Sequence, residues 1–151
     1  MIDHGIEINE STNDGTTALM YAAANNNINM IQLLIDHGAE LDVTTNDGVT
    51  PLMFACQNGQ LEAIKFLIKK KVDINFHDNK GWNSVMHAVR NGNEKIIKYL
   101  IDHGANVNSS DEEGYNPLLL AAKYGLLNTI KCLIEYKADI NKKDINGNNV
   151  L

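Results

Sequence analysis

Apolar residues recur along the chain in two kinds of short segment. The segment 50–58, TPLMFACQN, is apolar at most positions over about two helical turns, whereas 28–37, INMIQLLIDH, carries its apolar residues at helical spacing. Both patterns predict α-helices. Thr50 is the expected N-cap of the first helix, with Pro51 in its first turn, and Gly59 is expected to end it in the left-handed backbone conformation.

This pair of segments repeats every 33 residues, and glycine marks the period without a slip at Gly15, Gly48, Gly81, Gly114 and Gly147. Four full units run over 12–44, 45–77, 78–110 and 111–143. Residues 1–11 match the end of a unit and 144–151 match the start of one. A period of this length predicts a solenoid, in which each helix pair buries its apolar surface against the neighbouring pairs.

Several columns recur together at this spacing: Asp78, Gly81, Thr50-Pro51-Leu52, Ala22-Ala23, Gly59, Leu67-Ile68, Gly104-Ala105 and Val107-Asn108. The unit they define resembles the ankyrin repeat, over essentially the whole chain. The resemblance implies an all-α fold, an ankyrin-repeat solenoid of stacked antiparallel helix pairs. It also implies short β-hairpin or turn fingers that project to one side and leave a concave face. We expect residues 1–151 to form a single domain of this kind.

The chain departs from the family where Thr-Pro-Leu-His carries its histidine, because that column reads Met20, Met53, Met86 and Leu119. In the family, the imidazole hydrogen-bonds a turn to its helix. Methionine is a flexible apolar side chain that fills irregular gaps. We therefore expect the polar tether to be replaced by packing alone, with these side chains facing inward.

The second helices also carry two unusual features. Lys71 and Lys137 occupy the column of Gly38 and Gly104, so we expect those two helix ends to be weaker by up to about 1 kcal/mol each. The apolar stripe of 28–37 is wide, and we expect neighbouring helix pairs to bury it on more than one side.

Composition limits the classes of partner and compartment. The net charge is −6, which argues against nucleic acid as a partner, since that binding depends on Lys and Arg neutralising phosphates. Residues 1–64 hold nine acids and no Lys or Arg, whereas 65–151 hold ten acids and all thirteen bases. No apolar run approaches the roughly 18 residues of a membrane span, and the N-terminus does not resemble a signal peptide. Two cysteines without metal spacing favour a reducing, cytoplasmic location.

The sequence contains no recognisable catalytic, cofactor or metal motif, so we expect no enzyme activity, no cofactor and no metal. His4, His37 and His103 share one column, where a place near helix C-termini explains them better than a metal does. Cys56 and Cys132 lie in packing columns and are expected to be buried.

Columns that vary between units while the framework repeats are the candidate binding surface, because the resemblance places them on or beside the concave face. Trp82 and Tyr115 are the leading candidates, since aromatic residues and arginine are enriched at interaction hot spots. The remaining candidates are Val49, Tyr21, Phe54, His87, Arg90, Leu120, Lys123 and Tyr124. For Tyr21, Phe54 and Leu120, ordinary half-buried packing is favoured over a contact role. We expect Trp82→Ala to weaken partner binding and to leave the thermal midpoint nearly unchanged.

These observations predict a non-enzymatic module that binds another protein, with the uneven charge orienting the partner and speeding its association. One alternative is a targeting or regulatory segment of a larger enzyme, channel or effector. Another is a substrate of asparagine hydroxylation at Asn75, Asn108 or Asn141, which the resemblance raises. Because neither end supplies a polar capping helix, we also expect a window from a longer array, monomeric in that context and weakly self-associating through its ends.

Overall fold

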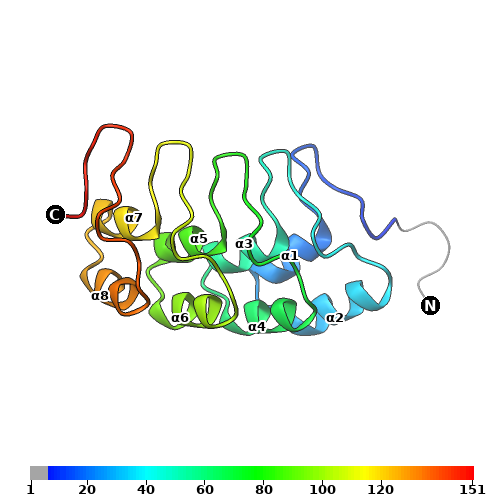
Figure 1. Cartoon of the computed structure of the whole chain (residues 1–151). Helices are drawn as coiled ribbons and strands as arrows, with labels where there is room; N and C mark the ends of the chain where they lie inside the picture. The colour runs from blue at the N-terminus through cyan, green and yellow to red at the C-terminus, as the bar shows by residue number, and fades with distance from the viewer. Residues whose placement is uncertain (1–6) are drawn as a thin grey trace.

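The computed structural model describes residues 7–151, and its architecture is a row of four helix pairs (Figure 1). The helices are α1 (Ala18–Ala24), α2 (Ile28–Asp36), α3 (Pro51–Gln57), α4 (Leu61–Lys69), α5 (Ser84–Asn91), α6 (Glu94–Asp102), α7 (Pro117–Lys123) and α8 (Leu127–Glu135). Helices α1, α3, α5 and α7 pack side by side as an inner row, and α2, α4, α6 and α8 form an outer row. The all-α solenoid predicted from the repeat is therefore confirmed.

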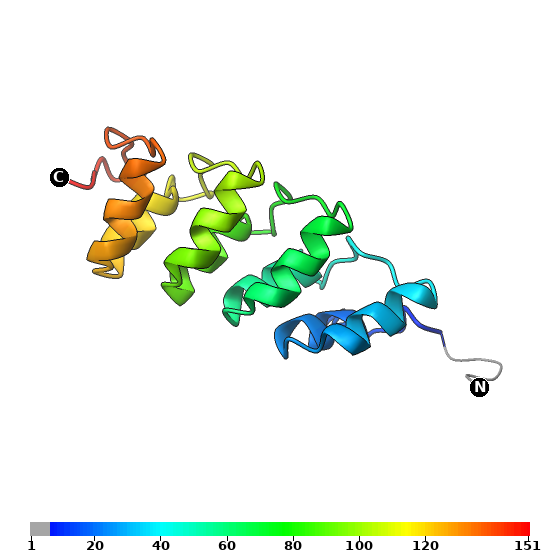
Figure 2. The same cartoon turned by 90° about the horizontal axis from the view of Figure 1, so that it is seen from below.

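Loops between successive pairs project to one side of the inner row as fingers, and the view from below shows the outer helices fanning along a gently turning stack (Figures 1 and 2). Each finger closes in a tight turn, for example through hydrogen bonds from Thr45 N to Val49 O (3.0 Å) and from Gly48 N to Thr45 O (2.9 Å). The fingers are turns and not paired strands, because the described residues form only one isolated β-bridge, between Ser11 and Thr17.

Glycine at the finger tip lets successive fingers approach closely. Gly48 has φ of +81°, and a Cβ at this position would lie 2.7 Å from Asn79 Oδ1 and 2.9 Å from Asn79 N. That approach allows Asn79 N to donate to Asp47 O over 2.9 Å, so that one finger is joined to the next. The 33-residue glycine column therefore reflects stacking between units as well as turn geometry.

The inner helices begin at the cap residues that the sequence predicts. Thr17, Thr50, Asn83 and Asn116 have extended backbone and accept a hydrogen bond from the N–H three residues later. Each cap satisfies one of the donors that the first helical turn leaves without a partner. These helices therefore start at the same place in every unit.

The predicted left-handed positions after the helices are also confirmed. Asn26 takes φ of 56° where Gly59 has 69° in the next unit. Lys71 and Lys137 are forced to positive φ, at 65° and 62°, in the column where Gly104 has 97°. A side chain with a Cβ is strained in this region of backbone space, which supports the expectation that these two helix ends are weaker.

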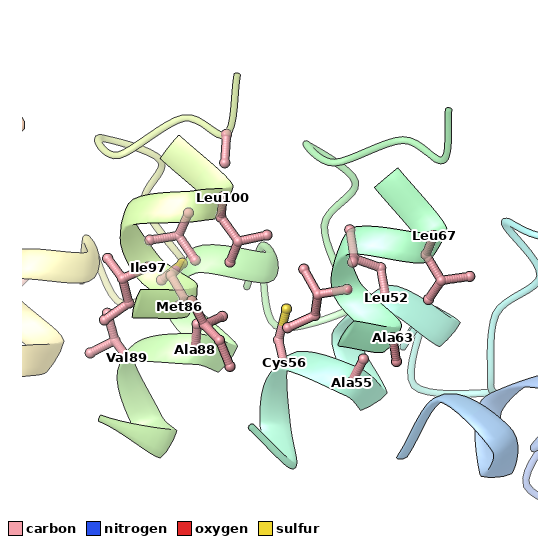
Figure 3. Close-up of a cluster of buried hydrophobic side chains, with 14 of the residues drawn as sticks. Leu52, Ala55, Cys56, Ala63, Leu67, Met86, Ala88, Val89, Ile97 and Leu100 are labelled. Atoms are coloured by element: carbon pink, nitrogen blue, oxygen red, sulfur yellow. The ribbon is translucent and has the colours of Figure 1, made fainter. Parts of the chain in front are cut away.

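The core is a continuous layer of buried side chains between the two rows and between adjacent pairs. Figure 3 shows Leu52, Ala55 and Cys56 of one pair facing Met86 and other residues of the next. Met20, Met53, Met86 and Leu119 are all buried, so the prediction that this column faces inward is confirmed.

The expectation that methionine acts by packing alone is wrong in the first two units. Thr17 N points at Met20 Sδ over 3.4 Å, and Thr50 N points at Met53 Sδ over 3.5 Å. The thioether sulfur is a weak acceptor, and here it accepts a hydrogen bond from the backbone N–H of the residue that caps the same helix. Methionine therefore keeps part of a polar tether between turn and helix while it fills the core.

The apolar stripe of α2 is not buried on both sides, contrary to the sequence prediction. Ile31 and Leu34 are buried, but Met30 is 42% exposed and Leu33 is 45% exposed. In the later units the column of Met30 is fully covered, for example at Ile96, because the preceding helix pair packs against it. Self-association through such a surface stays a prediction.

Asparagine side chains form hydrogen bonds between successive units. Asn75 donates through Nδ2 to Gly104 O (3.0 Å) and accepts from Asn106 N (2.8 Å), which joins the third unit to the loop of the second. Asn9 makes the same pair of bonds to Gly38 and Glu40 two units earlier. Hydroxylation in this column stays a prediction, although the structure gives these amides a clear role in stacking.

Candidate functional site

The candidate site is the concave surface where the fingers meet the inner helices, and two hollows flank Trp82 there. The first, of about 220 Å³, has Val49, Asn79, Trp82 and Arg90 in its wall. The second, of about 300 Å³, is bounded by Trp82, Tyr115 and Lys123, and by the acidic finger residues Asp111, Glu112 and Glu113. The indole of Trp82 therefore separates the two hollows. The first hollow lies between the second and third units, and the second lies between the third and fourth units.

The side chain of Trp82 lines both hollows and is also held in place by contacts with the rest of the protein. Its Nε1 donates to Asp111 Oδ2 over 3.0 Å, its ring centroid lies 5.3 Å from that of His87, and part of the ring packs on the core. Asp111 also accepts from Tyr115 N over 2.8 Å, so one carboxylate positions both leading aromatic candidates. This anchoring revises the expectation that Trp82→Ala would leave the thermal midpoint nearly unchanged.

Beneath Trp82 lies a polar chain of three side chains, of which Asp78 and His87 are buried and Gln57 is half-buried. His87 Nε2 is 2.9 Å from Asp78 Oδ2, and His87 Nδ1 is 3.0 Å from Gln57 Nε2. Asp78 Oδ1 accepts from the backbone N–H groups of Trp82 and Lys80, both over 2.9 Å. These hydrogen bonds join helix α3, helix α5 and the finger of the third unit, residues 78–82. The arrangement is rigid because every polar side-chain atom of Asp78 and His87 has a partner.

This chain perturbs the ionisation of Asp78. Burial by itself raises its pKa, but hydrogen bonds from His87 and from the backbone N–H groups of Trp82 and Lys80 outweigh burial and bring the pKa below the usual value. Asp78 is therefore a carboxylate at neutral pH, so Nε2 of His87 carries the proton between them. Nδ1, on the other side of the ring, lies against the Gln57 amide.

Two of the sequence candidates are not exposed contact residues. His87 is 4% exposed and Leu120 is 1% exposed, because their neighbours in the finger and in adjacent helices close over them. Both support the floor of the surface from below. The exposed fraction of this column falls along the solenoid, because Tyr21 in the first unit is 54% exposed and Phe54 in the second is half-buried.

The other candidates reach solvent. Arg90 and Lys123 are exposed at the C-terminal ends of α5 and α7, and Tyr124 is 43% exposed beside them. Val49, Trp82 and Tyr115 are half-buried on the fingers. Lys123 Nζ lies 4.5 Å from the centroid of the Tyr115 ring, which is the geometry of a cation–π contact.

The other reactive side chains have structural positions. Cys56 and Cys132 are buried free thiols, and burial raises the pKa of each. His37 Nδ1 and His103 Nδ1 each lie 2.8 Å from the carbonyl oxygen four residues earlier, at their helix ends, whereas His4 lies outside the described residues. Over 7–151, no three His, Cys, Asp or Glu side chains gather as a metal site would require. No helix in that range is long and apolar enough to cross a membrane.

Sequence reasoning missed Asp78, Gln57 and Asp111 as determinants of this surface. Asp78 and Asp111 share the first column of the finger, where the earlier units have Thr12 and Thr45. The available signal was the coincidence, in the third unit alone, of this Asp with a histidine at position 87.

Comparison with known proteins bears on the architecture. No curated protein matched the chain. A family model described as ankyrin repeats, in three copies, matches residues 1–78 and again residues 52–144. These matches, the repeated caps and glycines, and the fingered stack of helix pairs agree with one another, and the chain belongs to the ankyrin-repeat family.

Proposed function

We propose that this chain is a non-enzymatic module that binds one partner protein through its concave face and finger tips, around the second to fourth units. Ankyrin repeats are generally protein–protein interaction modules. The observation that carries the proposal here is the pair of hollows beside Trp82, whose rims carry the exposed cations Arg90 and Lys123.

The size of the hollows supports a protein partner. Volumes of about 220 and 300 Å³ lie at or below the lower end of the roughly 300–1,000 Å³ range of small-molecule sites. Each is suited to one or two side chains of a partner, and the two lie on either side of a rigid aromatic residue. Rigid aromatic residues supply contact area at low entropic cost.

A catalytic role for Asp78 and His87 has less support. An Asp–His pair activates a nucleophile when the second imidazole nitrogen faces a hydroxyl or thiol. Here that nitrogen contacts the Gln57 amide, and both residues are almost fully buried where they line the first hollow. We propose that the pair stiffens the recognition surface.

We also propose a cytoplasmic location, because the thiols of Cys56 and Cys132 are both free.

Site-specific photo-crosslinking tests the proposed surface. A photo-reactive amino acid placed at Arg90 or Tyr124 is expected to give adducts with a partner polypeptide in an extract of the source cell. The same amino acid at Lys95 or Lys131, exposed on outer helices α6 and α8, is the matched control and is expected to give none. Equal labelling at all four positions, or labelling at the outer positions alone, would contradict the proposal.

A further inference from the structure

Resting on the proposed function, we infer that the third and fourth units bind an acidic, extended segment of the partner, with two carboxylates three residues apart seated on Arg90 and Lys123. The observation behind it is one column of the concave face, Ala24, Gln57, Arg90 and Lys123, which changes from uncharged to cationic along the stack. The two cationic residues of this column line the two hollows on either side of Trp82.

Both cations are available to a ligand. Neither Arg90 nor Lys123 forms an ion pair with another residue of 7–151, and both are exposed. Lys123 is held over the Tyr115 ring, which orients its ammonium group without neutralising it. Arginine presents a planar fork that binds a carboxylate through two parallel hydrogen bonds.

The spacing of the helices sets the spacing of the ligand. Helices α5 and α7 are packed neighbours, and packed helices lie about 8–10 Å apart. A polyproline II segment rises about 3.1 Å per residue with three residues per turn, so residues i and i+3 lie on the same side about 9 Å apart. Two carboxylates at i and i+3 of such a segment therefore match the two cations. In a β-strand they would point to opposite faces.

The ligand residues between the two carboxylates would contact the indole of Trp82. Trp82 and Val49 supply apolar surface to the first hollow, and Tyr115 supplies it to the second. An apolar residue next to an acidic one would pack against the indole while its neighbour pairs with the cation. The specificity expected is for an acid, an apolar residue and a second acid in one extended stretch.

Charges at the finger tips restrict where the acids can sit. Asp47 lines the first hollow, and Asp111, Glu112 and Glu113 line the second. Each would repel a carboxylate on the finger side of its hollow, whereas Lys80 lines both hollows. Residues 1–64 carry no Lys or Arg at all. The acidic segment is therefore confined to the helix floor of the third and fourth units, away from the acidic first half of the solenoid.

Fluorescence anisotropy with synthetic peptides tests the inference. The probe is a fluorescein-labelled, proline-rich peptide of about ten residues, long enough to cross two units, with two Asp residues three apart and a Leu between them. We expect it to bind, and the matched peptide with both Asp replaced by Asn to bind about tenfold more weakly or worse. Binding of the Asp peptide is expected to weaken as salt is raised.

Charge reversal identifies the site. Arg90→Glu and Lys123→Glu are each expected to weaken binding of the Asp peptide about tenfold or more, because like charges then face each other. A peptide with Lys in place of Asp should gain affinity for the doubly reversed chain. Lys95→Glu and Lys131→Glu change the net charge equally on the outer helices and should bind like the original chain. Circular dichroism checks that each variant keeps its helices.

Three results would overturn the inference: equal binding of the Asp and Asn peptides, equal losses in the outer-helix variants, or tighter binding of a helical peptide with acids seven residues apart. If crosslinks form at Arg90 and Tyr124 while the peptides fail to discriminate, the concave partner stands and its acidic chemistry is wrong. If crosslinks form only on the outer helices, the proposed function itself fails.

Discussion

Asp78 Oδ2 accepts a hydrogen bond from His87 Nε2 over 2.9 Å, and both side chains are buried beneath Trp82. The pair occurs in one unit of the stack, since the columns of these two residues hold Thr45 and Phe54 in the unit before. A buried carboxylate that loses its partner keeps the full cost of desolvation, so the contact is a sensitive point of the fold.

Replacing His87 by leucine, which the fourth unit has in this column, is expected to lower the free energy of unfolding by about 1–3 kcal/mol. The substitution leaves Asp78 Oδ2 and the Gln57 amide without their partner. Urea unfolding monitored by circular dichroism measures the change. Phe54→Leu, in the same column of α3, has no carboxylate beneath it and serves as the control. Equal losses in the two variants would show that packing alone matters there.

Stability is expected to fall in acid partly through Asp78. Its pKa is lower in the folded chain than in the unfolded chain, so its contribution is fully present above the unfolded pKa of about 3.9 and is lost as pH falls through the lower folded value. Asp78→Asn should therefore flatten the decline of unfolding free energy below about pH 4. Asp14 and Asp144 also have lowered pKa values, so some decline remains. Asp47→Asn at an exposed tip is the control, and an unchanged slope in Asp78→Asn would refute the assignment.

Asn116→Thr is expected to stabilise the chain by about 1 kcal/mol. Asn116 caps α7 through its carbonyl oxygen, but its buried Nδ2 has no hydrogen-bond partner among the described residues. Threonine caps the equivalent helices α1 and α3 and brings no such donor. Asn83→Thr is the matched control, because Asn83 Nδ2 donates to Asn106 O over 3.0 Å and would lose that bond. Thermal unfolding should move the two variants in opposite directions.

Lys71→Gly and Lys137→Gly are each expected to raise the free energy of unfolding by about 0.5–1 kcal/mol. Both lysines hold positive φ, which glycine adopts without strain. The converse change, Gly104→Lys, should destabilise by a similar amount through backbone strain alone, since a Cβ there meets no atom within 4 Å. Chemical denaturation of the three variants measures both signs, and a loss of stability in the glycine variants would contradict the strain.

Trp82→Ala is expected to lower the unfolding free energy by about 2 kcal/mol, less than the 3–5 kcal/mol of a fully buried tryptophan. The ring is half-buried and its Nε1 is bonded to Asp111. Trp82→Phe keeps a ring beside His87 and loses the hydrogen bond, at about 1 kcal/mol. Loss of partner binding in Trp82→Ala is therefore informative only beside a stability measurement. An unchanged thermal midpoint would restore the expectation drawn from the sequence.

The sequence by itself determined the architecture, because its signals are local and repeated. Thr50 before Pro51, the glycine at each finger tip and the left-handed Asn26 act within a few residues of themselves, and four copies at one interval define the stack. Even the strained Lys71 could be predicted, since its column has glycine elsewhere.

Only the tertiary structure decided which variable residues are accessible and what holds them. Burial of His87 and Leu120, the bond from Trp82 to Asp111 and the thioether contacts of Met20 and Met53 all depend on groups in other helices, other fingers or the precise rotamer of a packed side chain. A column identifies equivalent places along the chain. Exposure and hydrogen bonding there depend on the neighbours that stacking brings within a few ångströms, and those neighbours differ from unit to unit.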